Sequence, residues 1–284
     1  MLWQFLLCIG LLISLFLFPK ASHYGAEQGI SIFLDTLLPY LLPYLLLTTW
    51  LFALLQRSNA SVRSAFIIAY ITSAIGGYPI GAIATCSLYS QQIITKKQAL
   101  WLLPFLHSPN PFFVINFVGV DLLNDISFSI YYLVLHHAIS ISAVWMIYRR
   151  VSRTSVPHPP SKPPTVQSVL EQTASTTMTI AITIIFFSSF TYISAELLKH
   201  QVPISITSIV IGAFELTNGL QFASSYLDSS YLPLYFAFLI SSQSISIHVQ
   251  VASITTAHKL SLSPYFFTRF LYTLFFTVLY AFLY

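Results

Sequence analysis

Residues 74–82 read Ala74-Ile-Gly-Gly-Tyr-Pro-Ile-Gly-Ala82, a run of helix-breaking residues in the middle of a hydrophobic segment. Residues 212–219 read Gly212-Ala-Phe-Glu-Leu-Thr-Asn-Gly219 and place a carboxylate in a second such segment. Backbone groups that leave a helix cannot face hydrocarbon, because no water is there to satisfy them. Paired interruptions in corresponding halves of a chain are typical of a transporter binding site. We therefore expect the two stretches to meet in a buried, hydrated pocket.

The composition of the 284-residue chain is that of an integral membrane protein. Hydrophobic residues make up 56% and charged residues only 7%, whereas roughly a quarter of a soluble domain is charged. Cys8 and Cys86 lie in apolar sequence, so neither a disulfide framework nor a cysteine metal site is indicated. The formal charge of +4 comes from basic residues in short connections, where they orient a membrane protein; we do not expect nucleic-acid binding.

Hydrophobic runs divide the chain into an N-terminal segment, two halves and a linker. Residues 1–29 are expected to hold an anchoring helix over 2–18, with a signal peptide as the alternative, and a link outside the membrane. Residues 30–150 and 167–284 form the halves, and residues 151–166, rich in Pro and Ser, form a cytoplasmic linker. The expected segments cover 31–55, 64–92, 99–119 and 127–148 in the first half and 169–197, 204–224, 232–256 and 264–284 in the second.

The distribution of basic residues predicts the topology. If segment 64–92 re-enters without crossing, most basic residues share one face, which is cytoplasmic by the positive-inside rule. These residues are Arg57, Arg63, Lys96, Lys97, Arg149, Arg150, Arg153 and Lys162. Each half then has an odd number of crossings and one re-entrant hairpin, so we expect an all-α polytopic protein of two inverted repeats with a cytoplasmic N-terminus. Arg269 is expected to snorkel to the inner surface.

Glycines gather at the two interruptions. Gly76, Gly77, Gly81, Gly212 and Gly219 all fall within or beside them. Glycine permits positive φ and close backbone approach, so half-helix ends there could present N–H groups to a polar or anionic ligand. The alternative is tight helix packing through small residues. Packing alone does not require Tyr78 and Pro79, which favours a binding site.

Glu215 is the most informative single residue. A carboxylate near the middle of a membrane costs roughly 2.5 kcal/mol or more to insert. It could coordinate a cation, carry a coupling proton or accept hydrogen bonds from a solute. The alternative is a buried acid bonded to the backbone of its own turn, with Thr217 and Asn218 completing that turn.

Other polar side chains lie on the segments beside the hairpins and could line the same cavity. They are His107, Ser108 and Asn110 in the first half and Ser241, Ser242, Gln243, Ser246, His248 and Gln250 in the second. Interhelical hydrogen bonding is the alternative role for each of them. His136 and His137 are adjacent in sequence and point about 100° apart on a helix, so we expect them to make helix contacts and not to share a metal.

Several motifs together resemble the nucleoside-recognition (Gate) domain family, and within it the sporulation integral membrane proteins of the YlbJ type. The matching stretches are Leu37-Leu-Pro-Tyr40, Gly77-Tyr-Pro-Ile-Gly-Ala82, Leu88-Tyr89, Ile94-Thr-Lys-Lys-Gln-Ala99, His107-Ser-Pro-Asn-Pro111, Phe214-Glu-Leu-Thr-Asn-Gly219 and Ser246-Ile-His-Val-Gln250. They occur in order across nearly the whole chain. The resemblance implies a fold related to concentrative nucleoside transporters.

For the sporulation branch, the resemblance also implies movement of dipicolinic acid across the outer forespore membrane. By motif position it places Gly77, Tyr78, Pro79, Gly81, Asn110, Glu215, Asn218, His248 and Gln250 around the substrate. Two departures stand out. Ile83 occupies a position where members commonly have Lys, and Ser242-Gln-Ser replaces a glycine-rich approach to the Ser-x-His-x-Gln motif.

We therefore expect a secondary transporter for a small polar or anionic aromatic solute, with nucleosides or nucleobases as alternative substrates. Motifs for nucleotide binding and hydrolysis are missing from the sequence, so no enzyme activity, catalytic residue, metal or cofactor is expected. Na+ or H+ could drive transport, and a homo-oligomer is left open. A non-transporting membrane scaffold for envelope or spore assembly is the second hypothesis, and an intramembrane hydrolase is the third.

Overall fold

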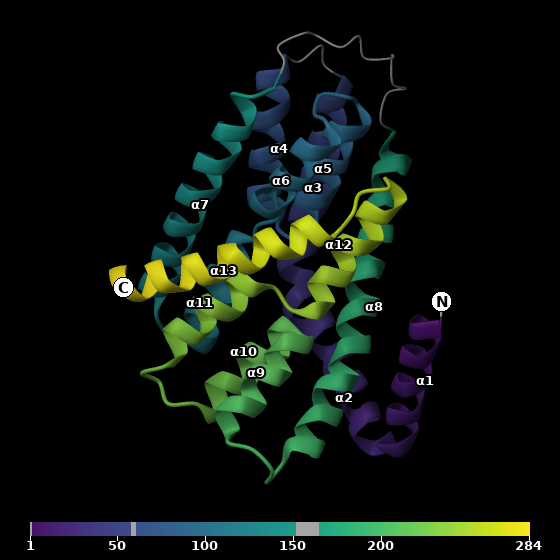
Figure 1. Ribbon diagram of the computed structural model, residues 1–284, viewed down its shortest axis with the longest axis vertical. Coiled ribbons are helices and arrows are strands. Elements are labelled where there is room, and N and C mark those ends of the chain that lie inside the picture. The colour runs from purple at the N-terminus through teal and green to yellow at the C-terminus, as the bar shows by residue number, and fades with distance from the viewer. Residues whose placement is uncertain (1, 58–60, 152–164) are drawn as a thin grey trace.

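Two long helical columns run the length of the protein in the computed structural model, which describes residues 2–57, 61–151 and 165–284. One column joins α2 (Pro19–Ser31), the π-helical segment η1 (Ile32–Leu37) and α3 (Leu38–Arg57); the other is α8 (Val166–Leu198). They lie side by side through α2 and α8 (Figure 1). At Gly25 a Cβ atom would lie 2.6 Å from the carbonyl oxygen of Ser188, so this close contact requires a glycine.

Two pairs of short helices approach each other from opposite ends of these columns. In the upper half of Figure 1, α4 (Val62–Gly76) and α5 (Ile80–Ser90) form one hairpin; in the lower half, α9 (Ile204–Phe214) and α10 (Leu216–Tyr226) form the other. These helices have 15, 11, 11 and 11 residues, or about 16–22 Å at 1.5 Å per residue. Each is therefore too short to cross a hydrocarbon core of about 30 Å.

Two further helices are interrupted beside the hairpins. The first is α6 (Lys96–Leu106), followed by the π-helical segment η2 (Phe113–Leu122); the second is α11 (Leu232–Ser242), followed by α12 (Ile245–Ala257). The uninterrupted helices α7 (Ile126–Tyr148) and α13 (Ser263–Leu283) close each half. The breaks expected at Gly76–Gly81, His107–Pro111, Glu215 and Ser241–Ser244 are thus confirmed.

The N-terminal region differs from its expected form. Helix α1 (Leu2–Leu17) has 16 residues, about 24 Å, and forms a helical hairpin with α2 at the edge of the protein (Figure 1). Residues 19–29, expected as a link outside the membrane, form most of α2 and pack on α8. The linker expected at 151–166 lies mostly outside the described residues.

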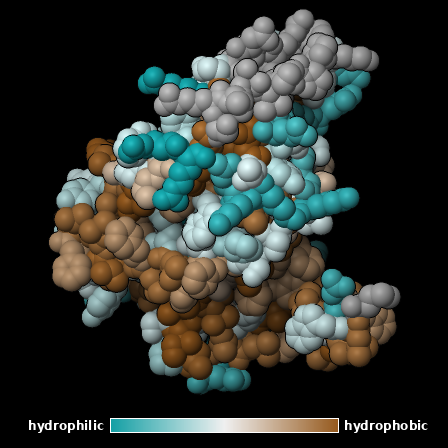
Figure 2. Space-filling view, turned by 45° about the horizontal axis from the view of Figure 1, so that its top comes forward, coloured by the Kyte–Doolittle hydropathy of each residue, from teal (hydrophilic) through white to brown (hydrophobic). Residues whose placement is uncertain are grey.

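The surface and the helix lengths are those of a multi-pass membrane protein. Among the described residues, the helices long and apolar enough to cross a membrane are Pro19–Leu54, Ile126–Tyr148, Val166–Leu198, Leu232–Ala257 and Ser263–Leu283. Large apolar side chains such as Phe16, Val134 and Phe267 are exposed. Hydrophilic residues gather at the upper end, above a broad hydrophobic surface (Figure 2). The ends of α3 and α7 and the starts of α4 and α8 all lie at that upper end (Figure 1).

Candidate functional site

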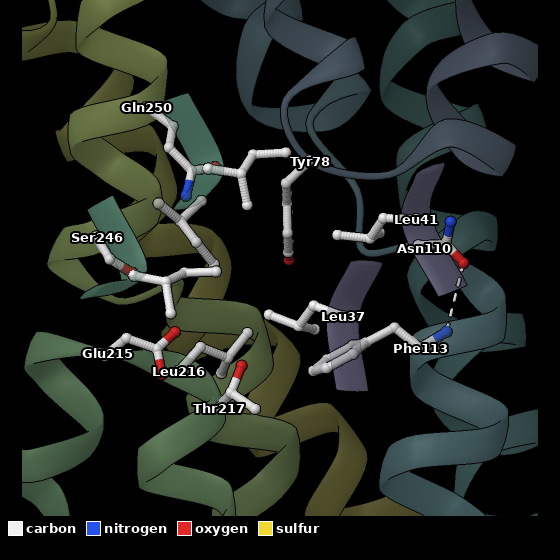
Figure 3. Close-up of a pocket in the computed structure, with 13 residues that line it drawn as sticks. Leu37, Leu41, Tyr78, Asn110, Phe113, Glu215, Leu216, Thr217, Ser246 and Gln250 are labelled. Atoms are coloured by element: carbon white, nitrogen blue, oxygen red, sulfur yellow. Dashed lines mark hydrogen bonds between the residues drawn. The ribbon is translucent and has the colours of Figure 1, made fainter. Parts of the chain in front are cut away.

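The tips of the two hairpins border one cavity at the centre of the protein. Tyr78 follows α4, and Glu215 separates α9 from α10; both line this first cavity (Figure 3). The cavity encloses about 50 Å³, room for roughly three water molecules at ~15 Å³ each. Its walls also include Leu37, Leu41, Asn110, Phe113, Ile180, Ile184, Leu216, Thr217, Ser246, Ile247 and Gln250.

Tyr78 is held between the two halves of the chain. Its hydroxyl donates to the carbonyl oxygen of Ile240 across 3.3 Å, and its ring centroid lies 4.7 Å from that of His107. The Tyr78–Pro79 peptide bond is cis. The phenol therefore contacts both interrupted helices while its side chain forms a wall of the first cavity.

Asn110 fixes the break in the first interrupted helix. Its Oδ1 accepts from the backbone N–H groups of Phe112 at 2.7 Å and Phe113 at 3.3 Å, and its Nδ2 donates to the carbonyl oxygen of Ile75 at 3.0 Å. The same side chain thus starts η2 and satisfies a carbonyl at the end of α4. Gly77 has φ +72°, and a Cβ there would lie 2.6 Å from Asn110 Cβ, so glycine is required where the hairpin meets this asparagine.

Glu215 combines a structural role with a place in the cavity wall. It is 2% exposed, and its Oε2 accepts from the backbone N–H of Asn218 at 2.8 Å and from Asn218 Nδ2 at 3.0 Å. This is the N-cap geometry of α10. The amide of Asn218 also donates to Ser188 Oγ at 2.6 Å. The alternative expected for Glu215, an acid bonded within its own turn, therefore describes one of its two roles.

Helix α12 supplies polar groups on the same side of the cavity as Glu215 (Figure 3). Ser246 and Gln250 line the first cavity; Ser246 Oγ lies 2.7 Å from Ser244 Oγ, and Gln250 Nε2 donates to Thr183 Oγ1 at 2.9 Å. Figure 3 shows Ser246, Gln250 and Glu215 along one side of the cavity, and Leu41 and Phe113 on the other side. An apolar surface with converging polar groups suits a small solute that has both a ring and polar substituents.

A second group of the expected site residues forms a buried hydrogen-bond network next to the first cavity. Gln243 Nε2 donates to the carbonyl oxygen of His107 at 2.9 Å, and Gln243 Oε1 lies 3.0 Å from His107 Nδ1. Tyr265 Oη donates to the same Oε1 at 2.9 Å and lies 3.2 Å from His248 Nδ1. Gln243 has φ +59°, which turns the chain at the break between α11 and α12. The network joins the breaks in the two halves.

Arg269 is buried, which corrects the expectation that it reaches the inner surface. It is 1% exposed, and its Nη1 donates to the carbonyl oxygens of Pro104 at 3.0 Å and His107 at 3.4 Å. Its guanidinium carbon lies 4.9 Å from the centroid of the Tyr272 ring. Its position near the start of the last span predicts a place at the surface. In the structure α13 lies across α11 (Figure 1), which places the residue inside the protein.

The remaining expected site residues support the backbone or lie beside the cavities. Ser108 Oγ donates to the carbonyl oxygen of Ser73 at 3.3 Å. Gly76 and Gly81 are buried in helix contacts, Gly81 against the backbone of Leu106 and His107. Ser242 donates to the carbonyl oxygen of Leu239 at 2.9 Å and lines a second cavity with Gln243 and His248. Pro79 precedes α5 as its N-cap residue.

His136 and His137 belong to separate contacts, as expected. His136 Nδ1 lies 2.6 Å from Tyr272 Oη, and His137 Nδ1 lies 2.8 Å from Tyr70 Oη. The two rings therefore bond to phenols on different helices, α13 and α4.

Sequence reasoning missed several residues of the site. Thr183 and Ser188 on α8 bind Gln250 and Asn218, and Tyr265 on α13 completes the network at Gln243. Both helices lack breaks, so no local pattern marked them. Hydroxyl groups at 183 and 188 within an apolar helix were the available signal, since such groups commonly bond to neighbouring helices.

The interrupted helices and the central cavity define a polytopic α-helical membrane protein. The chain is similar to the sporulation integral membrane protein YlbJ of Bacillus subtilis strain 168. The two are 23% identical over 308 aligned positions, which cover 89% of this chain and 75% of the relative. This similarity confirms the expected resemblance to the YlbJ type.

No protein-family model matches the chain, so the Gate-domain resemblance remains a prediction. No solved structure matches it either. The likeness to concentrative nucleoside transporters therefore also remains a prediction.

Proposed function

We propose that this protein is a secondary transporter for a small polar or anionic aromatic solute. One observation carries the proposal: hairpin tips from opposite ends of the protein, at Tyr78 and Glu215, line one cavity. Two hairpins that enter from opposite ends are typical of inverted repeats, in which the repeats move relative to a site at the middle of the membrane. The cavity of about 50 Å³ corresponds to a closed state that must widen to admit a solute.

The proposed orientation follows from basic residues at helix ends that lie at the upper end in Figure 1: Arg63 is at the start of α4, and Arg149 directly follows α7. The positive-inside rule assigns this end to the cytoplasm. The cytoplasmic N-terminus expected from the sequence requires in addition that α1 crosses the membrane, and its 16 residues, about 24 Å, are fewer than a straight crossing of about 30 Å needs. The resemblance to sporulation proteins makes dipicolinic acid the first solute to test and the outer forespore membrane the proposed location. Nucleosides and nucleobases are the second class of solute.

The test compares transport by proteoliposomes containing wild-type protein, Glu215→Gln and a matched control. Glutamine keeps an oxygen that can cap α10 but removes the charge. The effect of the charge on transport is therefore separated from the effect of the cap on stability. Glu171→Gln is the control, because Glu171 is an exposed carboxylate in the first turns of α8 and does not line the central cavity. Labelled dipicolinate, nucleosides and nucleobases are each offered with and without a Na+ or proton gradient.

We expect Glu215→Gln to reduce the transport rate at least tenfold while its unfolding temperature stays within a few degrees of wild type. Glu171→Gln is expected to transport normally. Transport by Glu215→Gln at the wild-type rate would show that transport does not need the charge of this carboxylate. Failure of every solute under every gradient would defeat the transporter proposal.

A scaffold without transport activity is the second candidate, and the N-cap role of Glu215 favours it. A buried acid that stabilises a helix start has a use without any solute. This candidate predicts that the wild-type protein transports none of the solutes. It also predicts that changes in the 151–165 segment impair envelope or spore assembly more than changes in the cavity.

A further inference from the structure

A second cavity lies between α9, α11, α12 and α13 and shares no lining residue with the first. It encloses about 310 Å³. Exposed apolar side chains surround its mouth, namely Ile209, Ile245, Phe266, Phe270 and Leu274. Because such a surface faces hydrocarbon in a membrane protein, the cavity opens sideways towards lipid.

The inner end of this cavity holds a buried positive charge. Arg269 lines it, and Nη1 is the only guanidinium nitrogen of Arg269 with hydrogen-bond partners among the described residues. Nε and Nη2 are buried and have none. Across the described ranges, the one ion pair joins His23 and Glu27, so no carboxylate described there neutralises Arg269.

The charge of Arg269 is compensated only in part. A charged side chain inside a membrane is costly and usually pairs with an opposite charge or with backbone carbonyl groups, and here such carbonyl groups bond to Nη1 alone. A buried donor of a charged group that lacks a partner adds a further desolvation penalty. The residues that line the cavity include His248 and no Asp or Glu, so nothing in its wall repels an anion.

The free edge of the guanidinium indicates which anion fits. Nε–H and the adjacent N–H of Nη2 point the same way in one plane, and this pair of parallel donors matches the two oxygens of a carboxylate or phosphate. Nη1, on the other edge, is already occupied by backbone carbonyls. Backbone carbonyl groups thus hold Nη1, whereas Nε and Nη2, the two nitrogens that could bind an oxyanion together, have no hydrogen-bond partner among the described residues.

We propose that Arg269 binds an oxyanion at the inner end of the second cavity. The ligand carries this oxyanion, a carboxylate or a phosphate, on an apolar body. The oxyanion accepts two hydrogen bonds from Nε and Nη2. The apolar body lies against the phenylalanine and leucine side chains of the cavity. An amphiphilic solute and an anionic lipid share this chemistry, and both could enter through the mouth between α9 and α13.

The test measures binding of benzoate and of its uncharged analogue benzamide to the full chain in phosphatidylcholine nanodiscs. We expect benzoate to bind at least tenfold more tightly than benzamide. Arg269→Gln should abolish this preference. Arg269→Lys should weaken it, because an ammonium keeps the charge but lacks the planar fork.

Arg269 also supports the backbone at Pro104 and His107, so its replacement can disturb the fold. Ala213→Trp provides an independent test, because Ala213 is an exposed residue of the cavity wall and a tryptophan there fills the space. Ala138→Trp, at an exposed alanine of α7, is the matched control. We expect only Ala213→Trp to abolish benzoate binding, with the unfolding temperature unchanged in both variants. Glu215→Gln should bind benzoate normally, so this proposal and the transporter proposal fail independently.

Nanodiscs of phosphatidylglycerol distinguish the two sources of the anion. Equal benzoate binding in both lipids identifies a solute site, whereas displacement of benzoate by phosphatidylglycerol identifies a lipid headgroup; either result supports the oxyanion site. Failure of benzoate to bind in phosphatidylcholine, equal binding of benzamide, or binding that survives Ala213→Trp would overturn it.

Discussion

The side-chain amide of Gln243 donates to the carbonyl oxygen of His107 across 2.9 Å, 136 residues earlier in the chain. Each residue lies at the point where a helix stops, so one hydrogen bond joins the breaks in the two halves. Tyr265 bonds to the same glutamine from α13. The carbonyl group freed at the first break thus finds a donor at the second, as buried backbone groups in a membrane require.

Gln243→Leu is expected to destabilise the protein by about 1–3 kcal/mol, because it removes the buried hydrogen bonds of Gln243 with His107 and Tyr265 and leaves His107 Nδ1 without its partner. Thermal unfolding in detergent measures the effect. Gln167→Leu is the matched control, since Gln167 is exposed near the start of α8. Equal unfolding temperatures for the two variants would show that the bridge contributes nothing.

Gly77→Ala is expected to destabilise the hairpin by at least about 1 kcal/mol, because alanine is strained at φ +72° and its methyl group would collide with Asn110. Gly10→Ala makes the same change in α1, where a Cβ meets nothing within 4 Å. The control should retain wild-type stability or gain a little from the better helix propensity of alanine. Differential scanning fluorimetry distinguishes the two, and a wild-type unfolding temperature for Gly77→Ala would contradict the prediction.

Asp125 is expected to make stability depend on pH. The hydroxyl of Tyr284 donates to Asp125 Oδ2 at 2.6 Å, and this hydrogen bond lowers the pKa of Asp125 below its usual value. A carboxyl with a lower pKa in the folded state stabilises the protein above its unfolded pKa of about 4 and loses that contribution as pH falls through the folded value.

Asp125→Asn should therefore lower the unfolding temperature at pH 7, and its difference from wild type should shrink as the pH falls below about 4. Asp121→Asn changes an exposed carboxyl of η2 nearby and serves as the control. A difference between Asp125→Asn and wild type that is the same at pH 7 and pH 3 would exclude ionisation of Asp125 as its cause.

The positions of the helix breaks could be predicted from sequence, because glycine, proline and polar residues within apolar segments have few other uses there. Gly76–Gly81 and Glu215 illustrate this. The separation of the expected site into two cavities could not be predicted. It depends on α13 lying across α11, and nothing in the pattern of an unbroken apolar helix fixes its crossing direction.

The role of Arg269 shows the same limit. From sequence, an arginine a few residues inside a span is expected to extend its side chain to the nearest surface. The carbonyl groups that hold it, at Pro104 and His107, become available only because the first interrupted helix ends there. The sequence did not indicate helix α2, because its mixture of polar and apolar residues is typical of a connection between helices. Its glycines at positions 25 and 29 are explained only by the close contact with α8.

The glycine-lined contact between α2 and α8 limits where the protein can rearrange. At Gly25 and Gly29 the two backbones are so close that a methyl group would meet Ser188 or Ile185, and sliding one helix along the other would bring larger side chains into that gap. This contact therefore acts as a rigid frame shared by the start of the chain and its second half. We expect any motion that widens the central cavity to take place in the short helices around it, with the frame staying still.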